Sequence, residues 1–250
     1  MKNRAYRNYI FDFYGTLVDI LTDEKDPVLW DKLGQLYQAY GAAYEGDVLK
    51  KAYAKRVDQA RKELIELKGV AYPEIDLAHI FNQLYVDARP QSSNSNQPED
   101  WGQLIAMVFR VLSRKHVTTY PHTKEVLAFL KEQGCRIYLL SNAQAAFTNA
   151  EIDLMELRPY FDAIYLSSDV GICKPQPEFL KQVLDDHGLK PSETVMVGND
   201  LTTDIAVAEA VGIDGILLNT FPYSPRELEN SPIKPDRVIT DIEALKTNFT

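Results

Sequence analysis

Reactive side chains occur at four points of the chain, each directly after a short apolar run. A carboxylate can act as a nucleophile or bind a hard cation, hydroxyl and amide groups can hold the oxygens of an anion, and a lysine can balance negative charge. These residue types together predict a site that handles an anion with the help of a cation. The four segments are Asp12 to Leu17, Ser141 with Asn142, Lys174 with Pro175, and Gly198 to Asp200 followed by Asp204.

Each of these residues also has an ordinary structural interpretation. Asp12 before Gly15 is typical of an Asx turn or a helix cap, and Asp200 with Asp204 is typical of a helix start. Lys174 before a proline is a common type of solvated loop residue. The order of the four segments, each at the end of an apolar run, favours one shared site over four unrelated turns.

The apolar runs that precede these segments have the length and composition of buried strands. Helical periods separate several of them, and this alternation predicts an α/β fold with a Rossmann-like, doubly wound parallel sheet. Because the carboxyl ends of parallel strands meet at one edge of a sheet, we expect the reactive segments to lie together. The expected strands are 9–13, 136–140, 163–166, 194–197, 215–218 and 237–239, and the expected helices are 123–133, 177–187 and 204–211.

Residues 21–117 show helical periods without intervening strands. We therefore expect a core made of residues 1–20 and 118–250, with residues 21–117 inserted as an all-helical cap over the carboxyl edge of the sheet. His122, where the chain returns to the core, is interpreted as a surface residue. The expected cap helices are 27–40, 48–67, 75–86 and 101–112, with a polar loop at 90–98.

The composition is that of a folded protein with an acidic balance. The 250 residues are 45% hydrophobic and 25% charged, with a formal net charge of -9. This charge disfavours a nucleic-acid partner, and no stretch is apolar and long enough to span a membrane. Cys135 and Cys173 are too few for a disulfide framework, and the first residues lack the features of a signal peptide. We expect a cytoplasmic protein with a small-molecule partner; its oligomeric state stays open.

The four segments resemble, in order, the four sequence motifs of the haloacid dehalogenase superfamily, and the insertion resembles the C1 cap of its subfamily I. The resemblance implies a Rossmann-like core and an enzyme that forms an aspartyl intermediate with Mg²⁺ as cofactor. It assigns Asp12 as the nucleophile, with Tyr14 and Lys174 as further catalytic residues. The implied substrate-binding residues are Thr16, Ser141, Asn142 and Lys174, and the implied metal ligands are Asp12, Tyr14 through its carbonyl, Asp200 and Asp204.

Tyr14 departs from the pattern of the family's phosphatases, which usually carry an Asp two residues after the nucleophile. That Asp protonates the leaving alkoxide and then activates water. A phenol, with a reference pKa of about 10, is a poor base at neutral pH, although it can donate a proton or a hydrogen bond. The sequence Asp-x-Tyr-Gly-Thr resembles instead the 2-haloacid dehalogenases, whose halide leaving group needs no proton. We expect the Tyr14 ring to point away from the metal.

Three functions are compatible with these residues. Asp200 and Asp204 favour the Mg²⁺-dependent hydrolysis of a small phosphorylated metabolite through an aspartyl-phosphate. Tyr14 favours a metal-independent 2-haloacid dehalogenase, although the arginine that this family places early in the cap has no counterpart between Arg7 and Arg56. The third function is that of a phosphate-binding or regulatory protein that has lost turnover with the missing Asp.

Overall fold

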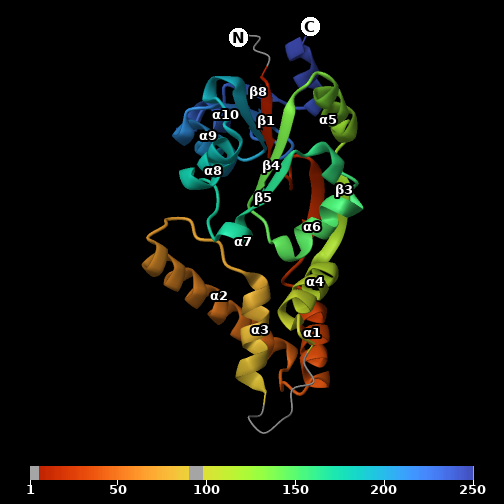
Figure 1. The fold of residues 1–250 in the computed structure, drawn as a ribbon. Helices are drawn as coiled ribbons and strands as arrows, with labels where there is room; N and C mark the ends of the chain where they lie inside the picture. The colour runs from red at the N-terminus through yellow and green to blue at the C-terminus, as the bar shows by residue number, and fades with distance from the viewer. Residues whose placement is uncertain (1–5, 90–97, 250) are drawn as a thin grey trace.

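The computed structural model describes residues 6–89 and 98–249, and within them six parallel strands form one sheet. The strand order is β5-β4-β1-β6-β7-β8 (Figure 1). After the central strand β1, the chain adds β4 and β5 on one side and then β6, β7 and β8 on the other. This is a doubly wound sheet, and the predicted fold class is confirmed. The strands are β1 (Asn8–Phe11), β4 (Arg136–Ser141), β5 (Ala163–Leu166), β6 (Thr194–Gly198), β7 (Asp214–Leu218) and β8 (Arg237–Ile239).

The central strand β1 is buried along its whole length. Ile10 pairs with Tyr138 of β4 and, on the other side, with a residue of β6. Tyr9 and Phe11 contribute to the hydrophobic cluster on one face of the sheet, whereas Ile10 contributes to the cluster on the other face. Successive side chains of a strand point to opposite faces, so a strand covered on both faces has to be apolar throughout.

Helices cover both faces of this sheet. α5 (Thr123–Glu132), α6 (Ala145–Leu154) and the 3-10 helix η4 (Ile242–Phe249) pack on the face of Phe11. α8 (Pro177–His187) and α9 (Ala206–Val211) pack on the opposite face. Full burial of one large aliphatic or aromatic side chain contributes roughly 1.5–3 kcal/mol. Shorter helices connect the elements: η1 (Arg158–Tyr160), α7 (Ser167–Val170), η2 (Pro191–Glu193) and α10 (Pro225–Asn230).

The core helices α6 and α9 differ from the sequence prediction, and the short helices α7, α10 and η4 are not predicted by it either. The helix expected at 204–211 begins earlier, with the π-helical turn η3 (Leu201–Ile205), because the Asp200 side chain accepts two N–H groups of the first turn. The sequence periodicity does not predict α6. Its buried positions include the polar residues Thr148 and Glu151, so a one-sided apolar stripe is missing.

The inserted helices form a second layer with a hydrophobic core of their own. Figure 1 shows them at the end of the molecule that faces the carboxyl ends of the sheet strands. The first helix starts where the sequence predicts: Asp26 accepts a hydrogen bond from the Val28 N–H at 2.9 Å, and Pro27 occupies the first turn. Phe147 of α6 joins this cluster from the core. The helices are α1 (Pro27–Ala39), α2 (Gly46–Lys68), α3 (Leu77–Ala88) and α4 (Trp101–Ser113). Of the loop expected at 90–98, residues 90–97 lie outside the described residues.

An antiparallel ribbon of two strands joins the cap helices to the core. β2 (Val18–Thr22) pairs with β3 (Arg114–Thr119). The expectation of helices alone across 21–117 is therefore wrong at both ends of that segment. Strands this short and half-exposed show too few residues for a clear two-residue period, and they are stable because they pair with each other. The ribbon straddles the boundaries expected near residues 20 and 118, and the division into core and cap stays a prediction.

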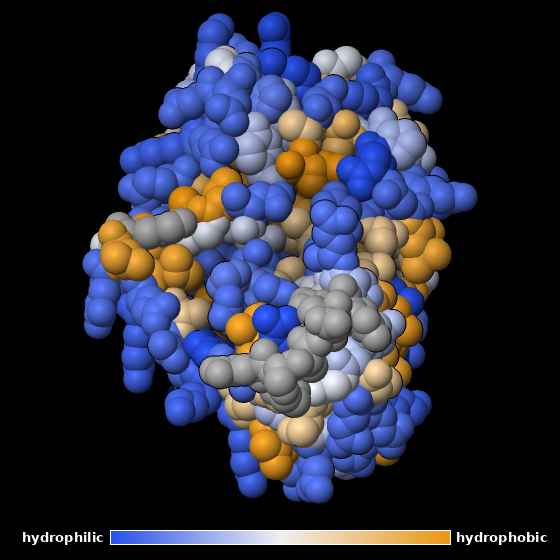
Figure 2. All heavy atoms as spheres, turned by 60° about the horizontal axis from the view of Figure 1, so that its bottom comes forward, coloured by the Kyte–Doolittle hydropathy of each residue, from blue (hydrophilic) through white to orange (hydrophobic). Residues whose placement is uncertain are grey.

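The surface is largely hydrophilic on the face where the helices α1–α4 come forward (Figure 2). Hydrophobic side chains on this face form separate groups between hydrophilic ones, and the exposed large hydrophobic residues belong to many different elements. Within the described residues, none of the helices combines the length and the apolar composition that crossing a membrane requires.

Candidate active site

A polar cavity of about 210 Å³ lies at the carboxyl ends of β1, β4 and β6. This is the point of a doubly wound sheet where ligands bind, because the connections on its two sides diverge there. The structure thus brings seven of the eight predicted site residues to one cavity, while Thr16 is buried beside Asp12. The lining residues are Asp12, Tyr14, Ser141, Asn142, Lys174, Asn199, Asp200, Thr203 and Asp204.

Lys174 lies between two carboxylates at the centre of this site. Its Nζ donates to Asp12 Oδ1 and to Asp204 Oδ1, both at 2.7 Å, and to the Leu140 carbonyl at 2.8 Å. The Lys174 side chain is 1% exposed, so these contacts are shielded from water. The three partners use all three N–H groups of the ammonium and fix its position.

The charges of Lys174, Asp12 and Asp204 shift the pKa values of the groups beside them. Burial alone would favour the neutral amine, but the negative charges of Asp12 and Asp204 outweigh it and hold the pKa of Lys174 above its ordinary value. Burial raises the pKa of Asp204, and the nearby Asp12 charge acts in the same direction while Lys174 opposes it. The Lys174 ammonium balances the charge of only one of the two carboxylates that it contacts. The cluster of Lys174, Asp12 and Asp204 therefore keeps an excess of negative charge.

Hydroxyl groups hold the Asp12 carboxylate from two sides. Ser141 Oγ donates to Asp12 Oδ1 at 3.2 Å, and Thr16 Oγ1 lies 3.3 Å from Asp12 Oδ2. Asn142 plays a different part, because its side-chain amide pairs with the backbone N–H and C=O of Lys174 at 2.7 and 2.9 Å. Its side chain therefore fixes the segment that carries the lysine.

The two aspartates of the segment from Gly198 to Asp204 have different partners. Asp204 Oδ2 accepts the Asp200 N–H at 3.0 Å, whereas Asp200 Oδ1 caps the turn η3 and accepts from Thr202 N at 2.6 Å. Gly198 permits this arrangement: a Cβ at Gly198 would lie 2.3 Å from Asp204 Cγ. Asp12 and Asp204 lie on either side of the ammonium, and Asp200 lines the cavity beside them.

The Tyr14 side chain turns toward α6. Its hydroxyl hydrogen-bonds Thr148 Oγ1 at 3.1 Å and makes a short hydrogen bond to Glu151 Oε2. Burial and the Glu151 carboxylate raise the pKa of the Tyr14 phenol, against the opposing charge of Arg110. The phenol is therefore neutral at physiological pH. Its backbone stands in the turn after β1, where the N–H groups of residues 16–18 donate to the carbonyl of Phe13.

Glu151 joins Tyr14 to two arginines that the four sequence motifs do not include. Arg110 of α4 makes a bidentate contact to Glu151 at 2.8 and 2.9 Å, and its guanidinium carbon lies 5.0 Å from the centre of the Tyr14 ring. Arg114, at the start of β3, adds a contact of 3.0 Å. Arg110 lies among the apolar residues that α4 buries, and a charged residue in such a stripe is the signal that could have revealed it.

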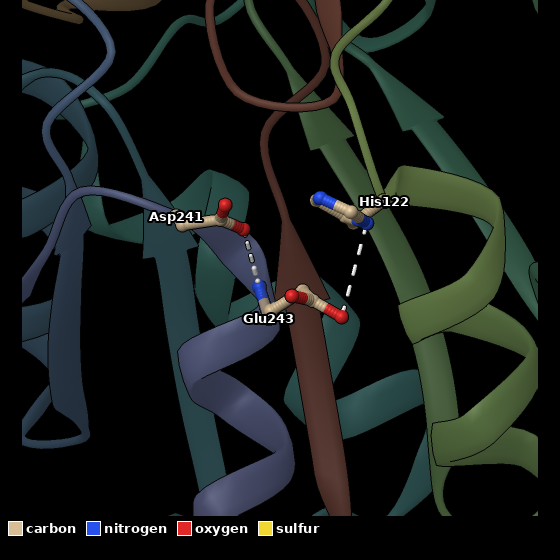
Figure 3. Close-up of side chains that lie close together, drawn as sticks. All are labelled: His122, Asp241 and Glu243. Atoms are coloured by element: carbon tan, nitrogen blue, oxygen red, sulfur yellow. Dashed lines mark hydrogen bonds and ion pairs between the residues drawn. The ribbon is translucent and has the colours of Figure 1, made fainter.

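A second group of potential metal ligands lies at the surface, outside this cavity. His122, Asp241 and Glu243 come from the start of α5 and from the segment after β8, and each offers a ligand atom within 4.8 Å of the others (Figure 3). His122 Nδ1 lies 3.2 Å from Glu125 Oε2 and 3.8 Å from Glu243 Oε1. The interpretation of His122 as a surface residue is confirmed, because it is exposed and pairs with these acidic side chains.

Relatives of similar sequence are named as phosphatases or as a nucleotidase. Glyceraldehyde 3-phosphate phosphatase of Methanocaldococcus jannaschii is 28% identical over 186 residues, which are 68% of this chain and 81% of the relative. The pyrimidine 5'-nucleotidase PynA of Streptococcus pneumoniae is 26% identical over 90% of this chain and 86% of its own. Ribulose-1,5-bisphosphate 5-phosphatase of Halopiger xanaduensis is 32% identical, but the match spans only about half of each protein (52%).

Solved structures match over nearly the whole chain. A 2-haloacid dehalogenase from Pseudomonas syringae superposes with a TM-score of 0.65 at 20% identity, covering 98% of both chains. A phosphatase of the same family from Thermococcus onnurineus superposes with a TM-score of 0.61 at 19% identity, covering 98% of this chain and 97% of the other. At such identities the likeness shows the fold alone. The model of one family matches residues 6–212, and the chain therefore belongs to the haloacid dehalogenase-like hydrolases.

Proposed function

We propose that this hydrolase is a Mg²⁺-dependent phosphatase that acts on a small phosphorylated metabolite through an aspartyl-phosphate. One observation carries the proposal: Asp12 stands at the switch point of the sheet, held by Lys174 and Ser141, in a cavity that two further aspartates line. The phosphatase names of the relatives support the same reaction class. Two dispersed free cysteines agree with action in the cytoplasm.

The proposed hydrolysis takes place in two displacements at phosphorus. In the first, an Asp12 carboxylate oxygen attacks phosphorus, and the bond between phosphorus and the leaving oxygen breaks with the electron pair on that oxygen. In the second, water attacks the same phosphorus, the bond to Asp12 breaks, and inorganic phosphate leaves with the proton of the water passing to solvent. Lys174 and Ser141, both in contact with Asp12, lie where they can hold the transferred phosphoryl oxygens.

The donor set of the cavity fits Mg²⁺. Asp12, Asp200 and Asp204 supply carboxylate oxygens, and Lys174 balances only one of these three negative charges. Asp12, Asp200 and Asp204 would hold the ion with the carbonyl of Tyr14, and Mg²⁺ there would neutralise charge on the phosphoryl oxygens. The proposed role of Tyr14 needs only its backbone, which agrees with a ring that contacts α6.

The 2-haloacid dehalogenase remains the second candidate because Tyr14 takes the place of the phosphatase Asp. Such an enzyme needs a cation for the carboxylate of its substrate. Arg110 is the cap cation beside Tyr14, but its bidentate contact to Glu151 already neutralises it. Arg110 is therefore not available to bind the substrate carboxylate, and the excess of negative charge around Lys174 favours a bound cation. Both observations rank the phosphatase before the dehalogenase.

A panel of phosphate esters and 2-haloacids, each assayed with Mg²⁺ and with chelator, tests the proposal. We expect 4-nitrophenyl phosphate to be hydrolysed with Mg²⁺ and not with chelator, and Asp12→Asn to abolish this turnover. Asp185→Asn, on the exposed side of α8, is the matched control and should retain it. Halide release from 2-chloropropionate in chelator would reverse the ranking. Phosphate or Mg²⁺ binding without any turnover would instead identify a regulatory protein, in which Tyr14→Asp should create activity.

A further inference from the structure

The Tyr14 phenol occupies the place of the phosphatase acid, yet its hydroxyl hydrogen-bonds to α6 and not to the nucleophile. Its hydroxyl contacts Glu151 and Thr148 of α6. Thr148 is fully buried and Glu151 is 2% exposed, so neither contact exchanges readily with water. The proton of the phenol is thus held in a hydrogen bond to a buried acceptor on α6.

Glu151 is in turn fixed by two arginines. Arg110 binds both of its oxygens, and Arg114 adds a third contact to Oε1. A Tyr14 phenol that gave its proton to a leaving group would become a phenolate against this carboxylate. Such a transfer would break the hydrogen bond from the phenol to Glu151, whose oxygens the two arginines hold in place, so the geometry keeps the proton on Tyr14.

The other titratable groups that line the cavity are also committed. Asp12 is the proposed nucleophile, and Lys174 uses all three of its N–H groups on Asp12, Asp204 and a backbone carbonyl. Asp204 accepts from Lys174 and from the backbone of Asp200. Asp200 caps η3 with one oxygen and is a proposed metal ligand with the other. Within the described part of the chain, the cavity walls therefore hold no group placed to protonate a leaving alkoxide.

We infer that this enzyme acts on phosphorylated substrates whose leaving group departs as a stable anion, such as an acyl phosphate or a phosphoric anhydride, and not on alkyl phosphates. The inference rests on the proposed phosphatase function and narrows its substrate class. During attack by Asp12, the leaving group keeps the electron pair of the broken bond and departs as a carboxylate or a phosphate, and no proton moves. An alkoxide leaving group would need the proton that Tyr14 withholds.

The test compares kcat/KM for acetyl phosphate, 4-nitrophenyl phosphate, phenyl phosphate and ethyl phosphate, all with Mg²⁺. kcat/KM reports the first irreversible step, the transfer to Asp12, so slow hydrolysis of the intermediate does not mask the effect of the leaving group. A positioned general acid is worth roughly 10²–10⁴-fold. We expect kcat/KM to fall along the series, with ethyl phosphate at least about 10²-fold below 4-nitrophenyl phosphate.

Two variants test directly whether the phenol takes part in proton transfer. Tyr14→Phe should change every rate by a common factor, because the hydroxyl does not protonate the leaving group, while Tyr14→Asp should raise ethyl phosphate relative to the aryl esters. Similar kcat/KM values for ethyl and 4-nitrophenyl phosphate in the wild type would overturn the inference and leave the proposed function standing. So would a selective loss of ethyl phosphate turnover in Tyr14→Phe. Failure to hydrolyse any phosphate with Mg²⁺ would overturn the proposed function and this inference together.

Discussion

Replacing Glu151 by Gln should destabilise the protein strongly, because the change leaves a guanidinium buried without its counter-charge. The Glu151 and Arg110 side chains are 3% and 10% exposed, and their contacts are 2.8 and 2.9 Å long. Removing one partner of a buried ion pair costs roughly 3–5 kcal/mol. Arg114 is 23% exposed and stays hydrated, so we expect the lower end, about 3 kcal/mol.

Urea or thermal unfolding of Glu151→Gln measures this loss. A change of about 3 kcal/mol corresponds to a fall in Tm of roughly 6–12 °C for a chain of this size. The matched control is Asp87→Asn, which breaks an Arg56–Asp87 pair whose side chains are 33% and 36% exposed. An exposed pair of this kind contributes about 0–1 kcal/mol.

A second variant shows whether the unpaired guanidinium is the cause. Adding Arg110→Met to Glu151→Gln removes the buried positive charge and should recover part of the lost free energy of unfolding. A Glu151→Gln variant that loses no more than about 1 kcal/mol of unfolding free energy, the range expected of the surface control, would refute the reasoning. The same holds if the double variant is less stable than the sum of the two single changes.

Three further outcomes follow from the structure. Gly198→Ala should displace the Asp204 carboxylate, since the added Cβ would lie 2.3 Å from Asp204 Cγ. We expect this variant to lose turnover and to bind Mg²⁺ more weakly in calorimetry. The control Gly215→Ala, whose added Cβ would have its nearest contact at 3.3 Å, should retain both turnover and Mg²⁺ affinity. If the proposed function holds, rapid mixing with 4-nitrophenyl phosphate should give a burst of about one nitrophenolate per chain, because no lining group activates the hydrolytic water. The hydrogen bond to Glu125 raises the pKa of His122, so the protonated imidazole stabilises the fold fully below its unfolded pKa of about 6.5, and this contribution is lost as pH rises through the higher folded value. His122→Gln should therefore remove a fall in the unfolding free energy that begins above about pH 6.5.

The parallel sheet could be predicted from the sequence because each of its strands is a contiguous apolar run. β1 and β6 are buried on both faces, so their composition alone separates them from the helices around them. The ribbon β2–β3 could not be predicted in the same way. Its residues are half-exposed and mixed in polarity, and the pairing that stabilises it joins segments about 100 positions apart.

Most of the residues around Asp12 could also be predicted, because they follow strands whose ends meet at one edge; Lys174 is the exception, since α7 separates it from β5. The use of each side chain could not be predicted from the sequence. Asn142 binds the backbone of Lys174, and Asp200 caps a helical turn. A polar side chain at either position has several possible hydrogen-bond partners. The partner that it binds depends on the three-dimensional structure around it.

Tyr14 shows the limit of a local motif most clearly. Its place in the motif predicts a backbone carbonyl near the metal and a ring directed elsewhere, but where the ring goes depends on Glu151, which lies 137 positions along the chain. Glu151 can be buried there only because Arg110 and Arg114 approach from the end of the cap. The same two arginines therefore join α4 and β3 to α6 and hold the acceptor of the phenol in place. The sequence around Tyr14 contains neither the acceptor Glu151 nor the arginines that neutralise it. What a Tyr at this position can do chemically is therefore decided by these distant residues.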